Sequence, residues 1–145
     1  MVWIGVLIAI CSGVLMSVQG VFNTGISKNA GLWPTGAFVS LTAAMVCMIL
    51  WDCTGKEGSF SSLFHTTPRY LLLSGALGAA ITGTVVYGIR SLGTARAELI
   101  IVIAQLSAAY LISVLGLFTS ESEPFSWQKL CALLLSAAGV LWYSM

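Results

Sequence analysis

The sequence predicts an all-α integral membrane protein with five transmembrane helices per chain. Of its 145 residues, 58% are hydrophobic and only 8% are charged, whereas soluble domains carry about 25% charged residues. The charges are confined to short segments and leave five apolar runs. A helix needs roughly 20 residues to cross a bilayer core, so each run is a candidate for one crossing. Transmembrane strands are excluded because these runs do not alternate polar and apolar residues.

The five runs predict helices bounded by polar or aromatic residues. The first run lacks the basic start and clear cleavage site of a signal peptide, so we interpret it as a retained helix. Trp33 and Trp51 bracket the second run as interfacial aromatics, and Pro34 suits a first helical position. The fifth run is short, and its helix is expected to begin at Trp127, behind Ser126. The expected helices are residues 2–24, 33–51, 70–90, 95–118 and 127–144.

The loops leave no room for a soluble domain. Residues 52–69 form the one substantial polar loop, and the other connections are short. We therefore expect a single transmembrane domain that covers residues 1–145. Catalysis is not expected, because the single histidine, His65, lies in the polar loop without a nucleophile or an orienting group beside it.

Cofactors, metals and nucleic acids are not expected either. The glycines lie inside the apolar runs rather than in phosphate-binding or dinucleotide-binding patterns. The four cysteines lack the spacing of a metal site and are interpreted as packing residues. A net charge of +1 without a basic cluster gives no support for nucleic-acid binding.

The basic residues are balanced between the two sides of the membrane, although an excess of lysine and arginine normally fixes the cytoplasmic side. With five spans, the two sets are Lys56, Arg69 and Lys129 on one side, and Lys28, Arg90 and Arg96 on the other. So few charges can balance by chance, but the balance also predicts insertion in both orientations. Two copies would then pair antiparallel and form ten helices with the inverted symmetry of many secondary transporters.

Polar residues on the first run share one helical face. Ser12, Gln19 and Asn23 are separated by seven and four residues, a spacing that places them on nearly one side of a helix. Uncharged polar groups within a span turn toward partner helices or toward a cavity. This polar stripe of Ser12, Gln19 and Asn23 therefore either makes hydrogen bonds between helices or lines a transport pathway.

The third run carries a surface of small residues, namely Gly75, Gly78, Ala79, Thr82 and Gly83. Small side chains allow another helix to approach closely, so helix packing is the expected role. The same surface would also allow helices to rock against each other during alternating access.

The fourth run contains Glu98 and Gln105, which lie on one helical face because they are seven residues apart. A carboxylate near hydrocarbon can take up a proton, which is the behaviour required of a proton-coupled exporter. The alternative is structural: if Thr94 caps the helix, Glu98 lies in its first turn, where the helix dipole and nearby arginines stabilise a negative charge. Gln105 lies roughly 10 Å deeper and is the firmer candidate for a cavity residue.

The segments "GVLMSVQGVFNTGISKNAG", "LLSGALGAAITGTVVYGIRSLGTA", "AQLSAAYLISVLG" and "SAAGVLW" resemble, in this order, the YdcZ-type family of small membrane proteins within the drug/metabolite transporter superfamily. The resemblance implies a five-helix half-transporter, in a family whose members occur as antiparallel homodimers, as pairs of sister chains with opposite orientations, or as fused ten-helix chains. It also implies polar positions at Gln19, Asn23 and Gln105.

The chain departs from the family pattern at two positions. Ala104 replaces a glycine before Gln105, and Ser113 stands where the family has an acidic residue. Glu98 lies outside the pattern, so the chain has either moved its charge or transports a solute that needs none.

The predicted function is export of small organic compounds by alternating access, in the bacterial cytoplasmic (inner) membrane. The expected partners are a second copy in antiparallel orientation or a sister chain, the membrane lipid and a small-molecule substrate. Two alternatives remain open. The chain could form a dual-topology channel for a small ion, or it could be a non-transporting subunit of a larger membrane complex.

Overall fold

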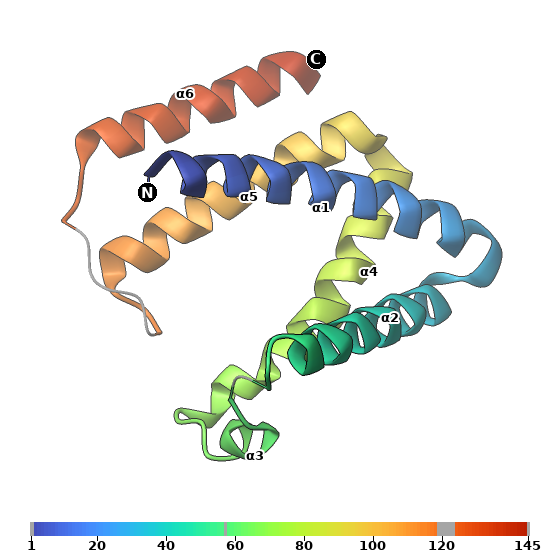
Figure 1. The fold of residues 1–145 in the computed structure, drawn as a ribbon. Helices are drawn as coiled ribbons and strands as arrows, with labels where there is room; N and C mark the ends of the chain where they lie inside the picture. Colours follow the sequence, from blue (N-terminus) through green and yellow to red (C-terminus); the bar gives the residue numbers. More distant parts are fainter. Residues whose placement is uncertain (1, 57, 119–123, 145) are drawn as a thin grey trace. The chain divides into compact units, whose positions relative to one another are not determined.

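The computed structural model describes residues 2–56, 58–118 and 124–144, and within these residues the fold is all helical (Figure 1). The elements are α1 (Val2–Ala30), α2 (Leu32–Cys53), α3 (Phe60–Leu63), the 3-10 helix η1 (Arg69–Leu73), α4 (Ser74–Leu92), α5 (Thr94–Leu115) and α6 (Trp127–Ser144). The predicted all-α class is therefore confirmed.

Four stretches are long and apolar enough to cross a membrane. They are Trp3–Ala30, Leu32–Cys53, Arg69–Leu92 and Thr94–Leu115, and they correspond to the first four predicted spans. The fifth predicted helix, α6, begins at Trp127 as expected, but it is not among these four candidate spans. Its first turn includes Gln128 and Lys129. A fifth crossing stays a prediction.

Several predicted helix ends were wrong. α1 continues to Ala30 instead of ending near residue 24, so the expected loop shrinks to one residue. α2 begins at Leu32, and Pro34 is its third residue rather than its first. Proline is tolerated there because the first amides of a helix have no partner within it. α5 stops at Leu115 rather than at residue 118, because Gly116 adopts a left-handed conformation with φ 58° and ψ 38°.

Single glycines connect two pairs of consecutive helices. Gly31 joins α1 to α2 with φ 85° and ψ 168°, and Gly93 joins α4 to α5 with φ 80° and ψ 160°. At the first of these corners, the Gly31 amide donates to the Ser27 carbonyl at 3.1 Å, and the Gly31 carbonyl accepts from the Thr35 amide at 3.4 Å. At the second, Gly93 makes the corresponding bonds with Ile89 and Ala97 at 3.0 and 3.1 Å. The chain therefore changes direction while the helical pattern of hydrogen bonds continues on both sides.

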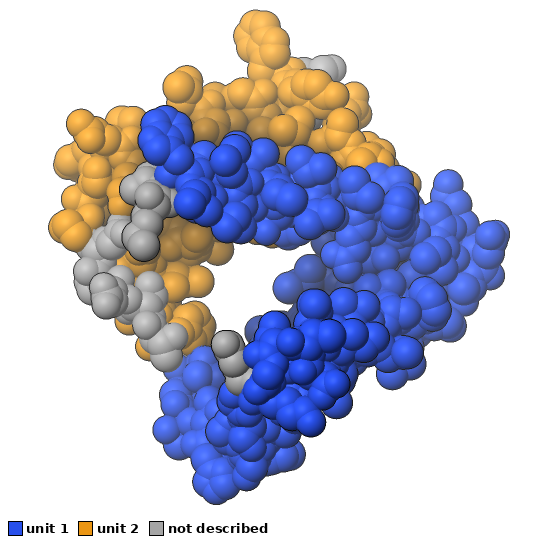
Figure 2. All heavy atoms as spheres, viewed as in Figure 1, with its two compact units in different colours: residues 1–87 blue, residues 88–145 orange. Residues whose placement is uncertain are grey.

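The chain divides into two compact units, Met1–Tyr87 and Gly88–Met145 (Figure 2). In the first unit α1 packs on α2, and in the second α5 packs on α6. The hydroxyl of Tyr110 on α5 holds the start of α6, since it donates to the Ser126 carbonyl at 3.0 Å and accepts from the Ser126 amide at 3.2 Å. The prediction of a single transmembrane domain stays a prediction.

Burial is concentrated around the two glycine corners. Ser27 and Thr35, four residues before and after Gly31, are 2% and 0% exposed. Ile89 and Ala97, at the same distances from the second corner, are 5% and 2% exposed. Along the rest of the described helices most large apolar side chains are exposed, a surface that a bilayer or a partner helix must cover.

We expect Gly93→Ala to lower the unfolding temperature of the detergent-solubilised protein. A Cβ at this position would have no atom within 4 Å. The loss of stability therefore reflects backbone strain alone, of about 1–3 kcal/mol. The matched control is Gly13→Ala on α1, where a Cβ also meets nothing within 4 Å. Because that glycine is helical, its substitution is expected to be neutral or stabilising. Equal unfolding temperatures for the two variants would contradict the assigned corner conformation.

Candidate functional site

The structure places four buried polar residues around the first glycine corner, and we call them the corner cluster. Three come from the C-terminal half of α1 and one from the first turns of α2. The members are Asn23, Thr24, Ser27 and Thr35, with exposed fractions of 6%, 7%, 2% and 0%. Among the residues described, these are the only buried polar side chains. The corner cluster is therefore the first candidate site.

The hydroxyl groups of the corner cluster are satisfied by the backbone. Thr24 Oγ1 donates to the Gly20 carbonyl at 2.8 Å, and Ser27 Oγ donates to the Thr24 carbonyl at 3.0 Å. Thr35 Oγ1 donates to the Gly31 carbonyl at 2.7 Å, a shorter contact than the 3.4 Å backbone bond to the same oxygen. Each hydroxyl thereby loses little on burial.

Asn23 differs from its neighbours in the corner cluster. Its carboxamide makes no hydrogen bond with another described residue, and its polar atoms are not fully enclosed. A nearly buried amide without a partner is costly in an apolar medium. Asn23 is therefore the α1 residue best prepared to bind a polar group. The other two residues of the predicted stripe, Ser12 and Gln19, are exposed on α1.

The small residues of α4 fall into two groups. Ala79, Thr82 and Gly83 line a groove of about 240 Å³ shared with α2. A Cβ on Gly83 would lie 3.9 Å from Leu32 Cδ2, which is ordinary contact, whereas Gly75 and Gly78 have open space. The α2 side of the groove is also built mainly from small residues and is completed by Leu32, Trp33, Gly36, Ala37 and Ser40.

Glu98 and Gln105 lie on α5 in the second unit. Glu98 is half-buried and Gln105 is exposed. The structural interpretation of Glu98 required Thr94 to cap the helix. That requirement was wrong, because the N-cap is Gly93, a residue without a side chain that could cap. Thr94 is the first helical residue, so Glu98 lies beyond the first turn, where stabilisation by the dipole is weaker. In the described part of the chain Glu98 also makes no ion pair with Arg96.

A second groove, of about 410 Å³, lies between α5 and α6. Leu99, Val102, Ile103 and Leu106 line one wall, so this wall is apolar, and Glu98 and Gln105 are not part of it. The structure therefore does not bring these two polar residues into the α5–α6 groove. Nor does it bring together three or more metal-ligating side chains among the residues that were described.

Sequence reasoning missed three members of the corner cluster, namely Thr24, Ser27 and Thr35. Asn23 and Ser27 are four residues apart, so a helix continued past residue 24 would have placed them on one face. Thr35 could be identified only once Gly31 was known to be the corner, because burial on α2 follows from its position four residues after that glycine.

The residues that the structure describes are all helical, include four apolar stretches of membrane-spanning length and expose most of their large apolar side chains, which defines a small multi-pass membrane protein. Residues 4–142 match the model of a family described as "Putative inner membrane exporter, YdcZ". The chain belongs to this family, and the resemblance deduced from its segments is confirmed. It is therefore a multi-pass protein of the inner membrane. Neither the curated proteins nor the solved structures gave a match.

We expect Thr35→Val to destabilise the protein by about 1 kcal/mol, because it removes the short hydroxyl bond to the Gly31 carbonyl at the corner. Thr42→Val is the matched control. The Thr42 hydroxyl also bonds to backbone carbonyls of its own helix, Phe38 and Val39, but it is exposed. Thermal unfolding in detergent should shift for the first variant and stay unchanged for the second. The same shift for both would show that the Thr35 hydroxyl bond contributes no more to stability than the exposed Thr42 bond.

Proposed function

We propose that the chain is a half-size transporter that exports small organic compounds by alternating access, as an antiparallel homodimer. The single observation that carries this proposal is membership over residues 4–142 in a family of inner membrane exporters. The described part of the chain has four candidate spans and α6, which are few helices to enclose a pathway, and a second inverted copy would supply the other half. Secondary transporters commonly use such inverted repeats, with the substrate site near the bilayer midplane.

The proposal includes α6 as the fifth crossing. Its 18 residues span about 27 Å at 1.5 Å per residue, close to the thickness of a bilayer core. It packs on α5, which is a candidate span. Five crossings place both glycine corners on one side of the membrane and the longer connections on the other.

The positions of the basic residues support the antiparallel pair. Lys28 and Arg90 each lie three residues before a corner glycine, and Arg96 lies three residues after the second corner. The opposite side carries Lys56, Arg69 and Lys129. Because the two sides carry equal numbers of basic residues, neither orientation is favoured by the rule that directs positive loops to the cytoplasm.

We assign the polar residues separate roles within this transporter. The side chains of Asn23, whose amide has no partner among the described residues, and of Gln105 contact the solute, with Gln19 and Ser12 continuing the stripe along α1. The carboxylate of Glu98 couples transport to protons. Two observations favour coupling over a purely structural role for Glu98: it lies beyond the first turn of α5, and it has no ion pair among the described residues.

The test is transport by the protein alone, reconstituted in liposomes with cationic, neutral or anionic solutes, with and without a pH gradient. We expect solute flux that depends on the gradient. Glu98→Gln should remove that dependence, and Gln105→Leu should lower the flux by about tenfold, equivalent to ~1.4 kcal/mol. Asp52→Asn is the matched control, because this exposed carboxylate pairs with Lys56 at the end of α2.

Three results would contradict the proposal. Gradient-driven flux that survives Glu98→Gln unchanged removes this residue from coupling. Flux at the rate of an open pore indicates a channel instead of a carrier. The absence of flux for every solute class, in protein that is folded by circular dichroism, favours a non-transporting subunit.

A further inference from the structure

The polar loop between α2 and η1 contains an apolar edge. Within the short helix α3 and the residue that follows it, Phe60, Leu63 and Phe64 have exposed fractions of 49%, 50% and 80%. Positions separated by three and four residues lie on one side of a helix. The intervening positions are serines, and Ser59 caps α3 by accepting from the Ser61 amide at 3.2 Å. The segment is therefore amphipathic, although it is too short to cross a membrane.

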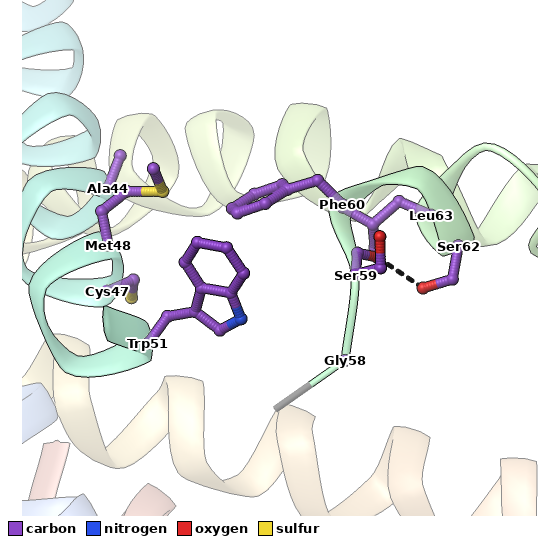
Figure 3. Close-up of a pocket in the computed structure, with 9 residues that line it drawn as sticks. All are labelled: Ala44, Cys47, Met48, Trp51, Gly58, Ser59, Phe60, Ser62 and Leu63. Carbon is purple, nitrogen blue, oxygen red and sulfur yellow. Dashed lines mark hydrogen bonds between the residues drawn. The ribbon is translucent and has the colours of Figure 1, made fainter. Parts of the chain in front are cut away.

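α3 and the end of α2 form a pocket of about 460 Å³ (Figure 3). One wall is a single face of α2, built by Ala44, Cys47, Met48 and Trp51, whose spacing of three, four and seven residues follows the helix. Phe60 and Leu63 form the opposite wall. Figure 3 shows the rings of Trp51 and Phe60 close together, and their centroids are 5.0 Å apart at an angle of 80°.

The position of the pocket identifies what would fill it. The α2 wall runs from Trp51, near the end of the helix, to Ala44, about 10 Å farther into the apolar stretch, and Leu32–Cys53 is one of the candidate spans. None of the described residues that line the pocket is charged. The nearby ion pair of Lys56 and Asp52, at 3.3 Å, is exposed at the end of α2. This arrangement is apolar toward the bilayer and charged toward water, as at a membrane interface.

We propose that the pocket between α2 and α3 binds one acyl chain of a membrane lipid, and that Phe64 lies in the interface as part of the same lipid-binding surface. α3 is held at the membrane interface because both ends of its loop join candidate spans, Leu32–Cys53 and Arg69–Leu92. The lipid covers the exposed apolar edge of α3 and the α2 face that lines the pocket. This inference rests on the membrane location of the chain and is independent of transport.

The experiment uses the full-length protein in liposomes that contain a small fraction of phosphatidylglycerol with a diazirine at the end of one acyl chain. After illumination, mass spectrometry locates the labelled residues. We expect label on residues 44–51 and also on residues 60–63. Ala44→Phe should fill the pocket and remove the label from residues 60–63. Ala43→Phe adds the same ring at the neighbouring position, which does not line the pocket, and should leave the label in place.

Two outcomes would overturn the proposal. One is equal labelling of residues 60–63 in the two variants, which would mean that lipid reaches α3 without entering the pocket. The other is absence of label from residues 60–63 in the unsubstituted protein, whether because the loop lies in water or because a second copy of the chain occupies the pocket. Because no solute is moved in this experiment, failure of the transport proposal would not affect its result.

Discussion

The backbone conformation of two glycines is the constraint on which the rest of the structure depends. Near hydrocarbon, every exposed amide or carbonyl is costly, so a turn between two spans is a weak point. Gly31 and Gly93 adopt positive φ with extended ψ, a region almost closed to other residues, and each continues the hydrogen bonds of both flanking helices. At the first corner Thr35 adds its hydroxyl bond to the Gly31 carbonyl, so the turn leaves few backbone groups unsatisfied.

The two corners share a backbone geometry but differ in chemistry. Ser27 lies four residues before Gly31 and Thr35 four residues after it. Ile89 and Ala97 lie at the same distances from Gly93. Among the described residues, buried polar side chains are thus restricted to the first unit, and they include Asn23, whose amide has no described partner. In the proposed antiparallel pair, the two copies would present one polar corner toward each side of the membrane. That arrangement suits a carrier that must bind its solute from both sides in turn.

Composition and apolar run length sufficed to predict the all-α class and the first four candidate spans, and Ser126 indicated the start of α6 at Trp127. The errors arose at helix ends, because the end of a run of apolar residues is not the end of a helix. Lys28 and Asn29 are polar but continue α1, since a basic side chain near a C-terminus is favourable. The burial of Thr35 could not be predicted, because it depends on which glycine turns the chain. The roles of Glu98 and Gln105 remain predictions, since they concern a solute and a partner copy.

The central claim is that two copies of this chain pair in opposite orientations. It is tested most directly by a reporter at the C-terminus, using an enzyme active only outside the inner membrane and a fluorescent protein active only inside. We predict comparable signals from both reporters, and a strong bias toward one after Asn29→Lys and Ser91→Lys add positive charge beside the two corners. Signal from one side alone in the unsubstituted protein would contradict the account.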